Sequence, residues 1–195
     1  MVIVEYLERP LTFFHLPKNA GTSISNWLVK HAGGEYYEEE MKHEVPSKLT
    51  GMFDDFGYSF CCVRNPYDRY VSWYKFFNRQ DKMQMQFNTF LDAVIAVVED
   101  HRAKPQKNKL LVKYIRPMTD QLQTTKDVDV VIRYENLVED FKAIQEMVSC
   151  HEPLEIHNST KKVDYKDYWT EDKHLEWFGN HHKIELETLG YKFGE

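Results

Sequence analysis

The stretch FFHLPKNAGTSISNWL, residues 13–28, decides the fold because it joins a short apolar run to a segment with helical spacing. The apolar run extends from Leu11 to Leu16 and predicts a buried strand. After the loop, apolar residues recur at helical spacing over residues 24–31, and Gly33-Gly34 ends the pattern. The sequence therefore predicts a strand, a loop and a helix in this order.

Residues 17–23, PKNAGTS, form the loop and carry the chemistry of an anion site. A loop that leads from a strand into a helix N-terminus points several backbone N–H groups at one place, where the helix dipole favours negative charge. Gly21 lets the backbone approach a ligand closely, Lys18 adds a positive charge, and the Thr-Ser pair that follows offers hydroxyl groups. The string GxxxxGK[ST] is absent, which argues against a magnesium-dependent kinase or ATPase. An ordinary strand-to-helix turn is the alternative interpretation.

A second apolar run, YSFCCV at residues 58–63, repeats this arrangement. Arg64 follows it directly, at the edge of an α/β sheet where ligands usually bind, and its planar guanidinium suits a phosphate. Pro66 favours a helix start, Ser72 lies about two turns along that helix, and Arg69 is a further cation on it. Either residue of the Arg64–Ser72 pair alone is typical of a solvated surface, whereas two such strand ends in one small sheet favour a phosphate-bearing ligand.

The rest of the chain alternates between helices and strands. Apolar spacing predicts helices at 66–77 and 87–98, a strand at 127–132, a helix at 137–148 and a helix from Thr170 to about Leu189. Apolar strands that alternate with helices indicate a parallel α/β sheet covered on both faces. A length of 195 residues predicts a single domain over residues 1–195.

The composition is typical of a soluble globular protein, with 42% hydrophobic residues, 29% charged residues and a formal net charge of −6. The negative charge argues against a nucleic-acid partner, although it is compatible with a local cationic pocket. Three cysteines, two of them adjacent, imply no disulfide framework, and no apolar run approaches the ~18 residues of a membrane span. Glutamates interrupt the first ten residues where a leader would be apolar, so a cytoplasmic location is expected.

Two motifs resemble the sulfotransferase family. HLPKNAGTS at residues 15–23 resembles the 5′-phosphosulfate-binding loop of these enzymes, and VRNPYDRYVSWY at residues 63–74 resembles their 3′-phosphate-binding segment. The segments PMTDQL, VDVVIRYENLVEDF and HNSTKKVDYKDYW, at 117–122, 128–141 and 157–169, are similar to the carbohydrate-type branch. The resemblance spans most of the chain and implies a P-loop NTPase-like three-layer sandwich with a central parallel sheet.

The resemblance also implies a donor, 3′-phosphoadenosine 5′-phosphosulfate (PAPS), and no metal. Lys18 matches the lysine that contacts the phosphosulfate and stabilises charge as sulfate leaves, while Arg64 and Ser72 match the pair that binds the 3′-phosphate. The loop that wraps the 5′-phosphate matches Asn19, Ala20, Gly21, Thr22 and Ser23. A late loop that closes over the cofactor matches HNSTKK, with Ser159, Lys161 and Lys162 as candidates.

His43 is the candidate for the catalytic base. Many members of the branch have a histidine shortly before the second strand, and an unperturbed imidazole, which titrates near ~6.5, can accept a hydroxyl proton at neutral pH. A merely polar surface residue is the alternative interpretation of His43. His15, just before the loop, is expected to pack or hydrogen-bond locally.

Together these residues predict in-line transfer of a sulfuryl group from PAPS to an acceptor hydroxyl, and the resemblance favours a carbohydrate as acceptor. Candidate cations for acceptor binding within residues 78–126 are Arg79, Lys82, Lys104 and Lys107. Two other functions stay open: a P-loop nucleotide kinase, and a non-catalytic module that binds an adenosine bisphosphate. The sequence predicts neither the acceptor's identity nor the oligomeric state.

Overall fold

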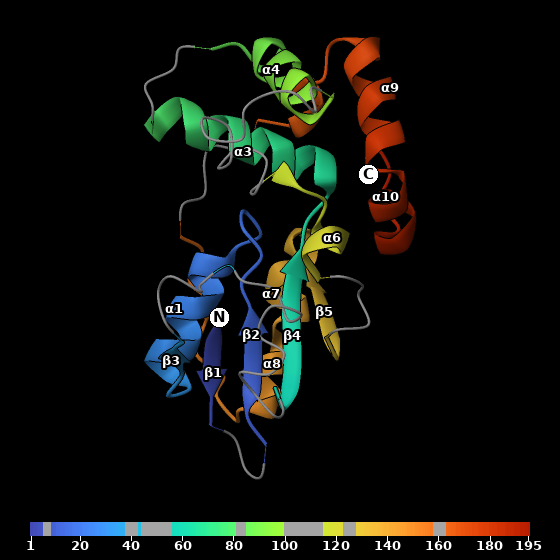
Figure 1. Cartoon of the computed structure of the whole chain (residues 1–195). Helices are drawn as coiled ribbons and strands as arrows, with labels where there is room; N and C mark the ends of the chain where they lie inside the picture. Colours follow the sequence, from blue (N-terminus) through green and yellow to red (C-terminus); the bar gives the residue numbers. More distant parts are fainter. Residues whose placement is uncertain are drawn as a thin grey trace. The chain divides into compact units, whose positions relative to one another are not determined.

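The computed structural model describes residues 1–5, 9–37, 43, 56–80, 85–99, 115–122, 128–157 and 163–195 (Figure 1). The chain divides into two compact units. One, the sheet unit, comprises Met1–Arg64 and Met118–Thr160, and the other, the helical unit, comprises Asn65–Pro117 and Lys161–Glu195. None of the helices in this described part of the chain combines the length and apolar character that crossing a membrane requires.

The sheet unit contains a five-stranded sheet in the order β3-β1-β2-β4-β5. The strands are β1 (Val2–Val4), β2 (Leu11–Phe14), β3 (Glu35–Tyr36), β4 (Tyr58–Val63) and β5 (Val130–Arg133). Strands β2, β4 and β5 are parallel, with Phe13 opposite Phe60 and Phe60 opposite Val130. β2 is buried throughout, as is β4 after its first residue, which explains their mainly apolar sequences. The prediction of a central parallel sheet is confirmed for these three strands.

Strands β1 and β3 lie at one side of the sheet and were not predicted. β1 runs antiparallel to both of its neighbours, with Val2 opposite Phe13 on β2 and opposite Tyr36 on β3. The sheet is therefore mixed at this edge rather than wholly parallel. Strands of two or three residues are too short for an alternating pattern to be recognised in the sequence.

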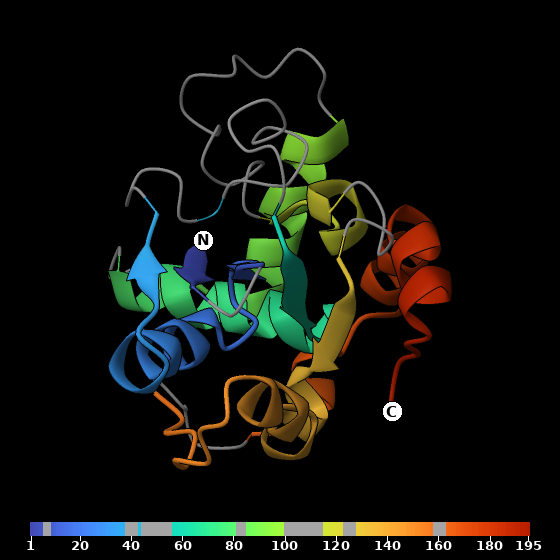
Figure 2. The ribbon, with the colours of Figure 1, turned by 90° about the horizontal axis from the view of Figure 1, so that it is seen from below.

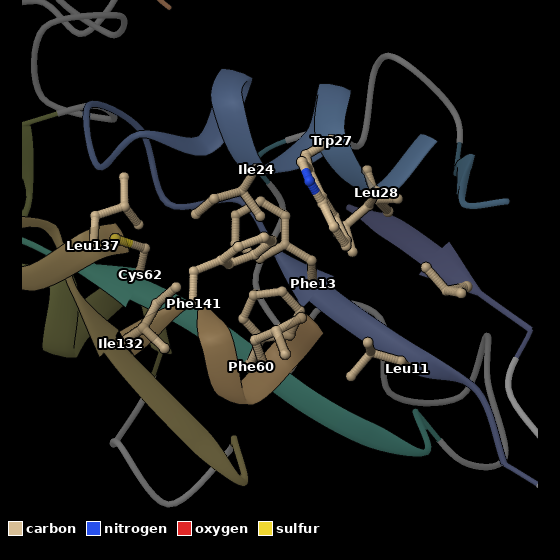
Figure 3. Close-up of a cluster of buried hydrophobic side chains, with 13 residues drawn as sticks. Leu11, Phe13, Ile24, Trp27, Leu28, Phe60, Cys62, Ile132, Leu137 and Phe141 are labelled. Atoms are coloured by element: carbon tan, nitrogen blue, oxygen red, sulfur yellow. The ribbon is translucent and has the colours of Figure 1, made fainter. Parts of the chain in front are cut away.

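One face of the sheet is covered by α1 (Gly21–His31), α7 (Leu137–Asp140) and α8 (Lys142–Met147). Figure 2 shows α1 in blue and the α7–α8 segment in orange on the same side of the strands. Phe13 and Phe60 point into the layer between, where Trp27 of α1 and Phe141 meet edge to face at 5.0 Å (Figure 3). Full burial of each such side chain contributes ~1.5–3 kcal/mol. This core fixes the start of α1 relative to the ends of β2 and β4.

The region predicted as one helix at 137–148 is broken. A 3-10 turn, η3 (Tyr134–Asn136), follows β5 at once, and α7 and α8 follow it. Leu137, Phe141 and Ile144, which supply the apolar spacing of this region, all lie in the core. α6 (Met118–Leu122) also belongs to the sheet unit.

The helical unit contains α3 (Pro66–Gln80), α4 (Phe87–Glu99), η4 (Tyr165–Tyr168), α9 (Asp172–His181) and α10 (Lys183–Leu189). Both α3 and α4 begin where the sequence predicts. Asn65 caps α3, because its side-chain oxygen accepts a hydrogen bond from the Tyr67 N–H at 3.0 Å. An aromatic core that includes Tyr67, Tyr70 and Phe178 holds the unit together.

The prediction of one helix from Thr170 to Leu189 is wrong, because the helix is interrupted at His182. The His182 ring is buried, with Nε2 2.9 Å from the Tyr70 hydroxyl and Nδ1 2.6 Å from the Glu185 carboxylate. Burial raises the pKa of the Tyr70 hydroxyl well above its ordinary value. The apolar spacing continues across the interruption, so the sequence pattern does not reveal it.

Candidate functional site

The loop between β2 and α1 has an unusual backbone. Lys18 and Ala20 both have positive φ, 70° and 57°, a conformation that costs a non-glycine residue of order 1–3 kcal/mol and persists only where the surroundings impose it. The first helical hydrogen bond runs from the Ile24 N–H to the Ala20 carbonyl. The N–H groups of residues 21–23 therefore precede the helical ladder, and Ala20 at the N-cap has no side-chain oxygen with which to bind them. Backbone of this kind forms a concave site for anions.

Asn19 anchors this loop to β4. Its side chain is only 1% exposed, and its Nδ2 donates to the Cys62 carbonyl at 2.9 Å and lies 2.9 Å from the sulfur of Met118. Its Oδ1 is buried and has no hydrogen-bond partner among the described residues. The Asn19 side chain thus fixes the loop to β4. A contact between the Asn19 backbone and a phosphate stays a prediction.

Gly21 makes room for His15. A Cβ atom at position 21 would lie 1.9 Å from Cδ2 of His15, so the imidazole ring occupies the space that a side chain would fill. The absence of a side chain at Gly21 therefore serves internal packing, and the predicted close approach of the backbone to a ligand is untested. His15 packs locally, as the sequence predicted: it is 6% exposed and its ring stacks on Phe13 with centroids 5.9 Å apart.

His43 lies against this loop. Its Nδ1 is 3.0 Å from the main-chain carbonyl of His15, and the two imidazole rings meet edge to face with centroids 4.5 Å apart. The side chain is partly buried, and the role of His43 as a base stays a prediction. Residues 28 positions apart in the sequence are thus brought together beside the start of α1.

Arg64 follows β4, at the same edge of the sheet as the loop that follows β2, because the two strands are parallel. Its Nη1 donates to the Lys18 carbonyl at 3.2 Å, and its guanidinium lies over the Tyr134 ring at 4.0 Å from the centroid. Tyr134 follows β5, the third parallel strand, and sequence reasoning did not select it. The sequence feature that could have indicated Tyr134 is its position just after a predicted strand, as for Arg64. Three neighbouring strand ends therefore contribute to one cluster.

The two hydroxyl residues of the loop differ in their surroundings. Thr22 is exposed, whereas Ser23 is buried and its Oγ accepts a hydrogen bond from the His157 N–H at 2.9 Å. This bond brings the first residue of the HNSTKK segment to the start of α1. Three candidates of that segment, Ser159, Lys161 and Lys162, lie outside the described residues.

The remaining candidates lie in the helical unit. Ser72 is partly buried on α3, and its role with Arg64 stays a prediction. Arg69, considered above as a further cation, is only 1% exposed and donates to the Arg116 carbonyl at 2.9 Å, so it holds the unit together internally. Arg79 is exposed near the end of α3, and Lys82, Lys104 and Lys107 lie outside the described residues.

The cysteines of β4 are poorly suited to nucleophilic chemistry. Burial raises the pKa of the Cys61 thiol to about 12 and raises that of Cys62 well above its ordinary value.

The cluster at the three strand ends offers cations, backbone N–H groups and an imidazole, which together can bind an anionic ligand and accept a proton.

Comparison with known proteins identifies the family of this chain. A model of the sulfotransferase family matches residues 7–183. Among solved structures, a sulfotransferase from Alicyclobacillus acidocaldarius is similar with a TM-score of 0.42 and 13% identity. The similarity covers 75% of this chain and 60% of that one, so this chain spans about three fifths of that protein. A search of curated proteins finds no match. Because the family model covers most of its length, this chain belongs to the sulfotransferase family.

Proposed function

We propose that this protein transfers a sulfuryl group from PAPS to a hydroxyl group of an acceptor. The observation that carries the proposal is the loop at residues 17–23, where two positive-φ residues and an uncapped helix start lie beside the Arg64 guanidinium. Such a cluster is suited to a ligand with more than one phosphate or sulfate group. Membership of the sulfotransferase family supports the sulfuryl group as the group transferred.

The candidate residues fit a nucleotide donor. The N–H groups of Gly21, Thr22 and Ser23 would bind its 5′-phosphosulfate together with Lys18, and Arg64 with Ser72 would bind its 3′-phosphate. The donor supplies a sulfuryl group joined to a good leaving group. Lys18 carries the positive charge that would balance negative charge as it accumulates on that leaving group.

His43 is the proposed base. Its imidazole lies against the loop, so an acceptor hydroxyl that reaches the ring beside the loop would give up its proton there. The other loop residues act by orientation and by fixed electrostatics, which account for most of the acceleration in comparable group transfers. In this mechanism no side chain of the cluster forms a covalent bond to the substrate.

The wider architecture is proposed to be a P-loop NTPase-like sandwich in which the two units act as a single sulfotransferase domain over residues 1–195. The parallel pairing of β2, β4 and β5 and the phosphate-type loop after β2 support this proposal. We also propose that residues 157–162 close over the donor, and the hydrogen bond from the His157 N–H to Ser23 supports this. For the acceptor we propose a carbohydrate hydroxyl.

Incubation of the full chain with PAPS and a mixed panel of carbohydrate, peptide, lipid and small alcohol acceptors tests the proposal. Mass spectrometry should find a sulfated product. Heat of binding with adenosine 3′,5′-bisphosphate but no product from any acceptor would favour a non-catalytic binding module. Phosphate transfer from ATP that requires magnesium would favour a kinase.

Replacement of Lys18 by alanine tests the loop itself. Loss of a charge aimed at the reacting group lowers turnover by a factor of about 10²–10³ in comparable sites, and Lys18→Ala should lower kcat at least a hundredfold. Circular dichroism should show an unchanged fold, because the partly exposed side chain contributes little packing. Lys30→Ala is the matched control, since Lys30 is an exposed lysine of α1 that lies 3.7 Å from Glu155. Undiminished turnover in Lys18→Ala would remove Lys18 from the mechanism.

A further inference from the structure

The contact between His43 and His15 determines which ring nitrogen of His43 can act as a base. A carbonyl oxygen can only accept a hydrogen bond, so Nδ1 of His43, 3.0 Å from the His15 carbonyl, must carry a hydrogen. A neutral imidazole has one N–H, and its other nitrogen holds the lone pair. Neutral His43 in this position therefore has its lone pair on Nε2.

The carbonyl that selects this tautomer is held firmly. The Leu16 N–H donates to the Phe14 carbonyl at 3.1 Å, which forms a tight turn centred on His15. On one side the His15 ring stacks against Phe13, and on another it fills the space above Gly21. The orientation of the His15 main chain is thus fixed by the end of β2 and by the first residue of α1.

The same side chain also contacts the ring that it positions. The imidazoles of His15 and His43 meet at 82° with centroids 4.5 Å apart, so the His15 ring limits rotation of the His43 ring about its own axis. His15 consequently contacts both the loop that begins α1 and the candidate base. The loop itself is also held by the Asn19 side chain, which donates to the Cys62 carbonyl of β4.

We propose that His15 is the positioning residue of the catalytic base: its carbonyl holds His43 as the Nδ1–H tautomer, and its ring, packed on Gly21, couples that tautomer to the phosphate-binding loop. This inference rests on the proposed function. The acceptor proton moves to Nε2 of His43, and the electron pair of the O–H bond forms the new O–S bond. The bond between the sulfuryl group and the bisphosphate breaks with its electron pair, and the imidazolium later releases its proton to water.

The tautomer can be measured directly and without a donor. Long-range proton–nitrogen correlation spectra of the full chain, labelled with ¹⁵N-histidine and recorded where the ring is neutral, report which nitrogen carries the hydrogen. The His43 signals are assigned by their absence in His43→Gln. We expect Nδ1 to be protonated and Nε2 to be bare. A His43 ring protonated on Nε2 overturns the proposal.

His15→Ala tests the coupling. Removal of the ring should let His43 populate both tautomers and should lower kcat about tenfold or more, while the dissociation constant for adenosine 3′,5′-bisphosphate changes by less than threefold. His151→Ala is the control, since His151 is an exposed histidine of the same unit, and it should leave the His43 spectrum unchanged. Equal losses of nucleotide affinity and kcat with an unaltered tautomer would show that His15 only packs the loop.

The two proposals fail differently. If the wild-type chain sulfates no acceptor, the proposed function fails whatever the spectrum shows. If it sulfates an acceptor but His43 carries its hydrogen on Nε2, the function stands and the role given to His15 is wrong. Should His15→Ala not fold, the spectrum of the wild-type chain still decides the assignment.

Discussion

Gly21→Ala is the sharpest test of the loop geometry, because the consequence follows from a single contact. The new methyl group would lie 1.9 Å from Cδ2 and 2.0 Å from Nε2 of His15. The ring would have to retreat by about 1.5 Å to reach ordinary van der Waals contact, and overpacking of this kind costs ~1–3 kcal/mol. Alanine recovers a few tenths of a kcal/mol by its helix propensity at the first turn. The expected net loss is about 1–2 kcal/mol.

Thermal and urea unfolding measure this loss. For a chain of this size each kcal/mol lowers Tm by ~2–4 °C, so Gly21→Ala should unfold about 2–8 °C below the wild type. Gly179→Ala in α9 is the matched control, because among the described residues its Cβ would meet only the Tyr67 hydroxyl, at 3.8 Å. That substitution should be neutral or stabilising by ~0.5–1 kcal/mol.

The contact with His15 can be isolated by a double-mutant cycle. In a His15→Ala background the ring is gone, so Gly21→Ala should cost at least about 1 kcal/mol less than it does in the wild type. Equal costs in both backgrounds, or an unchanged Tm for Gly21→Ala alone, would refute the packing of His15 on Gly21.

Two further predictions concern charged groups. Hydrogen bonds from His174 and Lys173 lower the pKa of Asp92 below its ordinary 3.8. The stability that this carboxylate contributes is therefore present above pH 3.8, and it is lost as the pH falls through the lower pKa of the folded state. Urea midpoints measured between pH 2 and 5 should fall more steeply for the wild type than for Asp92→Asn, and parallel curves would contradict this. Tyr134→Ala removes the ring under the Arg64 guanidinium, a contact of ~0.5–1 kcal/mol, and should weaken binding of adenosine 3′,5′-bisphosphate about two- to fivefold in calorimetry. Tyr134→Phe keeps the ring and should bind as the wild type does; equal affinity of all three proteins would remove the contact from the binding site.

The elements that the sequence predicts well are those whose signal is local. β2 and β4 lie within mainly apolar runs that are followed by Pro17 and by Arg64-Asn65-Pro66, and α1 and α3 begin at Gly21 and Pro66. The loop between β2 and α1 combines glycine, hydroxyl residues and lysine within seven positions, so its place at a helix start can be read from the sequence. Such patterns depend on neighbouring residues alone.

The features that the sequence does not reveal depend on which side chains meet in space. The stacking of Tyr134 on Arg64 needs β4 and β5 to be adjacent, and the packing of His15 on Gly21 needs the turn between them to be known. The helix is interrupted at His182, whose buried ring lies 2.9 Å from the Tyr70 hydroxyl, more than a hundred residues away in the sequence. In each case the residue type is compatible with several roles until pairing in space selects one.

The alternation of the chain between its two units has a consequence for the order of synthesis. The buried core of the sheet unit is complete once Ile144 has been made, whereas the core of the helical unit also needs Trp169 and Phe178. Since domains fold as they emerge from the ribosome, the aromatic side chains of α3 and α4 are expected to stay uncovered until Trp169 and Phe178 have emerged. Nascent chains arrested before residue 169 should therefore recruit chaperones through this segment and release them after α9 has emerged.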